Sequence, residues 1–75
     1  MSNLRKVSGE EAIRALERLG FVRVGQRGSH VVLTKDTPGR KLGCVVPLHR
    51  ELKIGTLRGI LHQAKVEVDQ FLAVL

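Results

Sequence analysis

Aromatic side chains are scarce in this 75-residue sequence, which has no tryptophan, no tyrosine and only two phenylalanines. The sequence therefore offers few aromatic side chains on which nucleic-acid bases could stack. The single cysteine, Cys44, excludes an intrachain disulfide and a zinc site built from cysteines. Because Cys44 lies in an apolar run, we expect it to be buried as a small hydrophobe rather than to act as a nucleophile.

Long apolar stretches are missing as well. Residues 1–6 lack the apolar region of a signal peptide, and no run approaches the roughly 20 apolar residues of a transmembrane helix. The carboxylates show no paired ligand spacing with the histidines, and there is no phosphate-binding Gly-x-x-x-x-Gly-Lys motif. We therefore expect a cytoplasmic protein with no metal, no small-molecule cofactor and no membrane contact.

Positive charge is what the sequence has in excess. Thirteen Lys and Arg against seven Asp and Glu give a formal net charge of +6. Such a field favours a polyanionic partner, either a nucleic acid or an acidic protein surface. The length suffices for one domain, so residues 1–75 are expected to form a single domain with a small core.

The segment after Val7 predicts an amphipathic helix. Ser8 is a suitable N-cap, and Glu11, three residues later, completes a capping box. Gly20 is expected to end this helix. Apolar residues recur at helical spacing in between, at Ala12, Ile13, Leu16 and Leu19.

Three strands are expected next, over residues 21–27, 30–35 and 41–47. Gly28 and Ser29 separate the first two strands. Residues 36–40, with Pro38 and Gly39, predict a turn before the third strand, which Pro47 closes. Connections this short favour an antiparallel meander.

A second helix is expected to begin near residues 54–56, after a polar, basic connector. Its buried face would consist of Leu57, Ile60, Leu61 and Ala64. Residues 68–75 predict a short closing helix, with Glu67 and Gln70 as an imperfect cap. Helix, three antiparallel strands and helix is the order of the double-stranded-RNA-binding domain, so we expect an α+β fold of that kind. Both long helices should cover one face of the sheet.

Four segments of the chain resemble the HicA family of toxins, small ribonucleases of toxin–antitoxin pairs. The segments are residues 7–10 leading into 19–21, then 26–30, 45–49 and 51–61. The resemblance implies a double-stranded-RNA-binding-like fold, cleavage of mRNA, inhibition by a HicB-type antitoxin, and a catalytic histidine at His30. Ile54 stands where proline is frequent in the family, and Lys65 where a helix-ending glycine is expected. These departures concern helix ends rather than the histidine.

Histidine is the chemically informative residue type here. Imidazole titrates near neutral pH, and a base that removes the ribose 2′-hydroxyl proton starts metal-free RNA cleavage. His30 is our candidate general base, although without the resemblance an ordinary strand-end histidine would be slightly favoured. His49 is a candidate second acid or base or a phosphate ligand, whereas a solvated loop histidine is the commoner case. His62 is expected at the surface.

Six further residues are candidates for RNA binding: Arg27, Gly28, Ser29, Lys53, Thr56 and Arg58. Gly28 would let RNA approach the backbone, and Ser29 would orient a phosphate or the imidazole, although an ordinary turn explains Ser29 equally well. Lys53 and Thr56 open the second helix, where backbone amides attract phosphate. For any one basic residue, a merely charged surface is nearly as good an explanation.

Three functions of different classes follow from these patterns. The first is a toxin that cleaves mRNA and blocks translation, held inactive by an acidic antitoxin. The second is a non-catalytic double-stranded-RNA-binding module, and the third is a small basic protein-interaction domain. All three share one fold, so the fold does not decide among them.

Overall fold

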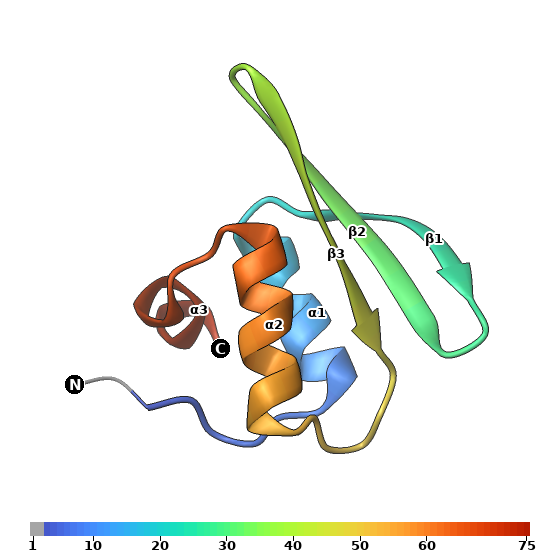
Figure 1. Ribbon diagram of the computed structural model, residues 1–75, viewed down its shortest axis with the longest axis vertical. Coiled ribbons are helices and arrows are strands. Elements are labelled where there is room, and N and C mark those ends of the chain that lie inside the picture. Colours follow the sequence, from blue (N-terminus) through green and yellow to red (C-terminus); the bar gives the residue numbers. More distant parts are fainter. Residues whose placement is uncertain (1–2) are drawn as a thin grey trace.

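The computed structural model describes residues 3–75. Its elements are α1 (Gly9–Arg18), β1 (Val22–Arg27), β2 (His30–Thr37), β3 (Arg40–Pro47), α2 (Ile54–Ala64) and α3 (Val68–Val74). The strands form one antiparallel sheet in the order β1-β2-β3, and the helices gather on one side of it (Figure 1). The expected α+β fold, a helix, a three-stranded antiparallel sheet and a helix with a short closing helix, is confirmed.

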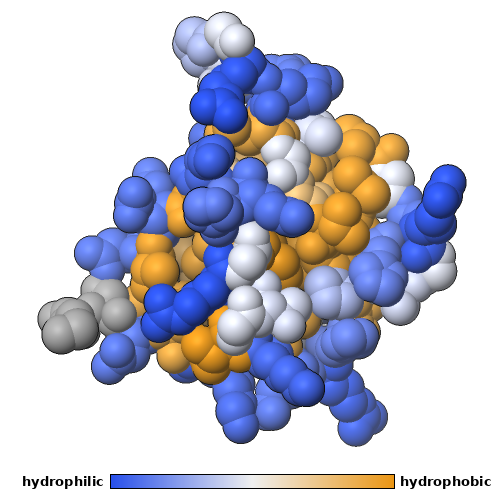
Figure 2. All heavy atoms as spheres, in the orientation of Figure 1, coloured by the Kyte–Doolittle hydropathy of each residue, from blue (hydrophilic) through white to orange (hydrophobic). Residues whose placement is uncertain are grey.

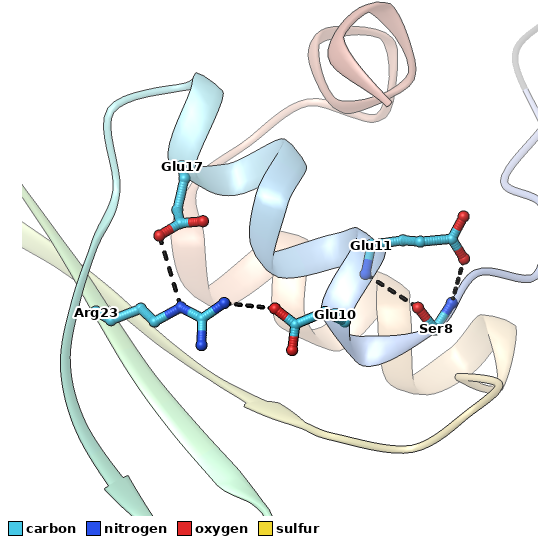
Figure 3. A network of polar contacts seen from close by, with 5 residues as sticks. All are labelled: Ser8, Glu10, Glu11, Glu17 and Arg23. Carbon is cyan, nitrogen blue, oxygen red and sulfur yellow. Dashed lines mark hydrogen bonds and ion pairs between the residues drawn. The ribbon is translucent and has the colours of Figure 1, made fainter.

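Both ends of α1 follow from local hydrogen bonding. The Glu11 N–H donates to Ser8 Oγ over 3.0 Å, and the Ser8 N–H donates to Glu11 Oε1 over 2.8 Å, which confirms the capping box (Figure 3). At the other end, the Phe21 N–H donates to the Leu16 carbonyl. Phe21 is therefore tied to the helix end and buried in the core, and β1 begins one residue later than predicted.

The β2–β3 hairpin is longer than the sequence indicated. Thr37 pairs with Arg40 around a two-residue turn, and Thr37 Oγ1 donates to the Arg40 carbonyl over 2.8 Å. The predicted five-residue turn was therefore wrong, because this closure keeps Asp36, Thr37 and Arg40 in the strands. The pairing of β1 with β2 starts at Val22 and Thr34, so the far part of the hairpin projects as a two-stranded ribbon (Figure 1).

The core lies between one face of the sheet and the helices. Val31, Leu33, Cys44 and Val46 alternate along β2 and β3 and are buried, so they define the inner face of the sheet. The predicted apolar face of α2 is buried, and so are Ala12, Ile13 and Leu16 of α1, whereas Leu19, which follows α1, is only half-buried. The closing helix α3 contributes the fully buried Phe71. Burial of each large apolar side chain stabilises the fold by about 1.5–3 kcal/mol. The prediction that Cys44 is buried is confirmed.

The ends of α2 carry the two departures from the family pattern. Ile54 is the first residue of the helix, and the preceding Lys53 makes no side-chain capping bond. Lys65 follows the last helical residue with a φ of 57°, a left-handed conformation that costs a residue other than glycine free energy. The Val66 N–H donates to the Leu61 carbonyl over 3.0 Å, which completes this helix end. Within residues 3–75, no helix is long and apolar enough to cross a membrane.

Candidate active site

The turn between β1 and β2 presents His30. Gly28 has a φ of 58°, and a Cβ built on it would meet no atom within 4 Å, so the turn is open to solvent. Gln26 Nε2 donates to the Gly28 carbonyl over 3.0 Å and braces the turn. His30 is the first residue of β2, directly opposite Arg27. The histidine backbone is thus held at the end of a hydrogen-bonded hairpin.

His30 combines a fixed backbone with an exposed side chain. Its backbone lies between Arg27 on β1 and Pro47 on β3, and its side chain is exposed. Because Val31 points to the inner face, the alternation of a strand turns His30 to the outer face of the sheet. Arg27 shares this face as the directly opposed residue, with a Cβ separation of about 4.5–5.5 Å in such pairs. The imidazole of His30 and the guanidinium of Arg27 are therefore neighbours, and both residues are exposed to solvent.

The segment carrying His49 is pinned beside this turn. The Leu48 N–H donates to the Ser29 carbonyl over 2.7 Å, and the Gly9 N–H donates to the His49 carbonyl over 2.8 Å. Both bonds use backbone groups, so neither engages the exposed His49 side chain. The structure thus brings His49 into the neighbourhood of Ser29 and His30.

Gly9 has a role that sequence reasoning missed. The sequence indicates only a helix start at this position, yet a Cβ on Gly9 would lie 2.0 Å from the Pro47 carbonyl oxygen. Only glycine allows α1 to begin this close to the end of β3. The one signal in the sequence is a poor helix former at the first helical position.

The predicted RNA-binding residues fall into two groups. Arg27, Gly28 and Ser29 lie with His30 at the β1–β2 turn. Lys53, Thr56 and Arg58 are exposed at the beginning of α2. Figure 1 shows the two places at separate corners of the molecule, with residues 48–53 between them. His62 is exposed on α2, as predicted.

The two arginines of β1 have different surroundings. Arg23 points to the helix side, where its guanidinium donates to Glu10 Oε1 and its Nε lies 3.6 Å from Glu17 Oε2 (Figure 3). The hydrogen bond to Glu10 raises the pKa of Arg23. Among the residues that the structure describes, Arg27 makes no ion pair. Arg27 is therefore the β1 cation available to a phosphate.

The outer face of the sheet carries an apolar patch beside His30. Val22, Val24 and Val45 are 60%, 59% and 41% exposed, and the half-buried Val32 lies between β1 and β3. Figure 2 shows apolar side chains gathered over the sheet, bordered by polar groups. The sequence did not reveal which valines would be exposed. Over residues 3–75, no group of three or more His, Cys, Asp or Glu side chains is placed to hold a metal ion.

Comparison with known proteins gives one family. A family model described as the HicA toxin of bacterial toxin–antitoxin systems matches residues 9–66, which include every candidate site residue named above. A search of curated proteins found no match.

Proposed function

Because the chain belongs to the HicA toxin family and is therefore the toxin of a toxin–antitoxin pair, we propose that it is a metal-independent endoribonuclease that cleaves mRNA and blocks translation. The observation that carries this proposal is the placement of His30, exposed on the outer face of the sheet and held between Arg27 and Pro47. A rigid backbone with a solvent-facing imidazole suits proton transfer to and from a bound substrate.

His30 acts as the general base. Its imidazole takes the proton from a ribose 2′-hydroxyl, and the oxygen attacks the adjacent phosphorus. The bond from phosphorus to the 5′ oxygen breaks, and an acid protonates that leaving oxygen. The products are a 2′,3′-cyclic phosphate and a 5′-hydroxyl, so no water or metal ion is consumed in this step. A positioned base contributes on the order of 10²–10⁴-fold to such a rate.

His49 is the proposed acid. Its support is the pair of backbone hydrogen bonds that hold residues 48 and 49 beside Ser29 and the start of α1. The side chain of His49 is exposed and can donate to a leaving oxygen on the same RNA strand. With one histidine on each side of the reacting phosphate, the proton removed and the proton donated pass through different groups.

The RNA backbone is held by positive charge and backbone amides. Arg27 contacts the reacting phosphate, Gly28 leaves room for the strand, and Ser29 orients a phosphate oxygen. Lys53, Thr56 and Arg58 hold phosphates at the N-terminus of α2, where the helix dipole favours anions. Affinity for single-stranded RNA then falls with salt, with a log–log slope of about −0.7 per phosphate contacted.

The partner is a HicB-type antitoxin with an acidic surface, and the site of action is the cytoplasm, where mRNA is translated. A net charge of +6 on 75 residues supports an acidic partner as well as RNA. An antitoxin that covers the outer face of the sheet would cover His30 at the same time.

Cleavage of a defined mRNA by the antitoxin-free protein tests the proposal. We expect His30→Ala to lower the cleavage rate at least 100-fold while RNA binding is retained. His62→Ala is the matched control, because His62 is an exposed histidine on α2 outside the site, and it should cleave at the wild-type rate. His49→Ala should slow cleavage without changing the fold.

Two measurements distinguish the proposed metal-independent reaction from other kinds of RNA cleavage: the chemical ends of the RNA products, and the activity in the presence of a chelator. Cleavage should continue in excess chelator and leave 2′,3′-cyclic phosphate ends. Ends with a 3′-hydroxyl, or loss of activity with the chelator, would contradict the mechanism. Tight binding of RNA duplex with no scission by any variant would instead identify a non-catalytic binding module.

A further inference from the structure

The sheet has two edges, and they are not equivalent. β1 forms one edge and β3 the other, because the strand order is β1-β2-β3. The pairing of β1 shifts between Arg23 and Gly25, so β1 carries a bulge. Bulges twist an edge and interrupt the row of backbone groups, which protects it from pairing with another strand. The pairing of β3 with β2 runs without a shift from Arg40 to Pro47.

The free edge of β3 presents a regular row of backbone groups. Hydrogen-bonded and non-hydrogen-bonded pairs alternate along an antiparallel ladder. The Leu48 N–H donates to the Ser29 carbonyl, so even-numbered residues of β3 turn their backbone groups toward β2. The N–H and C=O groups of Lys41, Gly43 and Val45 therefore point away from the sheet. Pro47 has no N–H and ends the row.

An open groove follows this edge. A cavity of about 440 Å³ is lined by Val32, Gly43, Cys44, Val45 and Gln63. Gly43 is exposed and has no side chain to obstruct the backbone, and Val45 is 41% exposed. Gln63 comes from α2, so the groove has the strand edge on one side and a helix on the other. Its lining suits an extended segment whose alternate side chains face the valines.

We propose that an extended acidic segment of the antitoxin adds to this edge as a fourth strand beside β3. Positive charge favours an acidic partner: Arg40 begins β3, Arg50 follows its end, and the whole chain carries a formal net charge of +6. A second copy of this chain would bring the same positive charge to the edge, whereas an acidic segment neutralises it. Backbone hydrogen bonds would supply affinity, and the groove would supply specificity.

This inference rests on the pairing with an acidic antitoxin proposed above and not on ribonuclease activity. Val45 and Val32 lie on the outer face with His30, because their backbone positions alternate with the buried Val46 and Val31. A strand bound at the β3 edge would thus anchor the antitoxin next to the face that carries the imidazole. Inhibition would follow from coverage of that face.

Amide hydrogen exchange of the ¹⁵N-labelled protein, measured by NMR with and without its purified cognate antitoxin, tests the proposal. In the free protein, the amides of Gly43 and Val45 should exchange quickly, whereas those of Cys44 and Val46 should be protected by β2. Binding of the antitoxin should slow exchange at Gly43 and Val45 at least tenfold. Unchanged exchange at both amides in a saturated complex would overturn the proposal.

Two substitutions at Val45 distinguish the contribution of its backbone N–H to antitoxin binding from that of its side chain. Val45→Pro removes an N–H that points away from β2, a position at which proline is tolerated on an edge strand. It should weaken antitoxin binding at least tenfold, whereas Val45→Thr, which keeps the N–H and the β-branch, should stay within about threefold. Equal affinity of the two variants would overturn the proposal. If Val45→Pro does not fold, the exchange measurement on the unsubstituted protein decides.

Two other ligands of the β3 edge, a second copy of this chain and RNA, would give different results in the exchange experiment. Protection of Gly43 and Val45 that rises with protein concentration in the absence of antitoxin would assign the edge to a second copy and overturn the proposal. Protection of these amides by RNA and not by antitoxin would do the same. A chain that fails to cleave RNA would overturn the ribonuclease proposal alone, because the exchange experiment contains no RNA.

Discussion

Gly9 and Pro47 approach so closely that a Cβ on Gly9 would sit 2.0 Å from the Pro47 carbonyl oxygen. The Gly9 N–H donates to the His49 carbonyl at the same place. This contact joins the beginning of α1 to the end of β3 and fixes the backbone next to His49. The position of a candidate catalytic group therefore depends on the absence of a single methyl group.

Gly9→Ala should destabilise the fold. The added methyl group would meet backbone atoms, which cannot rotate away, so we expect the free energy of unfolding to fall by about 1–3 kcal/mol. Gly59→Ala is the matched control: a Cβ there meets no atom within 4 Å, and alanine favours the helix by up to about 1 kcal/mol. Denaturant unfolding of both variants measures the difference. If the Gly9→Ala variant were as stable as the wild type, the backbone around Pro47 would have to shift to accommodate the methyl group, which would contradict this prediction.

The capping box at Ser8 should make stability depend on acid pH. The hydrogen bond from the Ser8 backbone to the Glu11 carboxylate lowers the pKa of Glu11 below its ordinary value of 4.5. Since the folded pKa lies below the unfolded one, this stabilisation is present above the unfolded pKa and is lost as pH falls through the folded pKa. NMR titration of the Glu11 carboxyl should give a value below 4.5.

Two variants separate the charge of Glu11 from its hydrogen bond. Glu11→Gln keeps the acceptor of the capping box but does not titrate, so it should stay near wild-type stability at pH 7 and lose part of the acid dependence. Ser8→Ala removes the cap and should cost about 1 kcal/mol at pH 7. A Glu11 that titrates at or above 4.5 would contradict this reading.

Cys44 should react slowly while the protein is folded. Burial raises the pKa of the Cys44 thiol from 9.0 to about 11. At pH 8 the thiolate fraction, and with it the rate of alkylation, should be about a hundredfold lower in the folded than in the unfolded chain. Iodoacetamide labelling with and without denaturant, followed by mass spectrometry, measures the ratio.

The same shift has a consequence for stability at alkaline pH. The folded pKa is raised, so the stabilising effect of the neutral thiol is complete below the unfolded pKa and is lost as pH rises toward about 11. Cys44→Val should reduce the loss of stability over this range. Equal labelling rates for folded and unfolded protein would mean that the thiol is accessible.

Local sequence determined most of the fold. The Ser8 cap, the helical spacing of apolar residues and the Pro38–Gly39 turn each depend on interactions among residues close in the chain, so their outcome could be predicted. The turn between β1 and β2, next to which Arg27 pairs with His30, could be predicted for the same reason. The length of β2 and β3 was underestimated, because whether Thr37 and Arg40 pair depends on how tightly the turn closes.

Only the tertiary structure decided how distant segments meet. The sequence marks Gly9 as a helix start, but its contact with Pro47 exists because α1 is laid across the end of β3. Likewise, the exposure of Val45 and the free edge of β3 follow from the strand order and from which face the helices cover. Short-range hydrogen bonds and side-chain periodicity depend only on residues that are close together in the sequence. Steric contact and exposure depend on the position of every neighbouring element, which no local pattern contains.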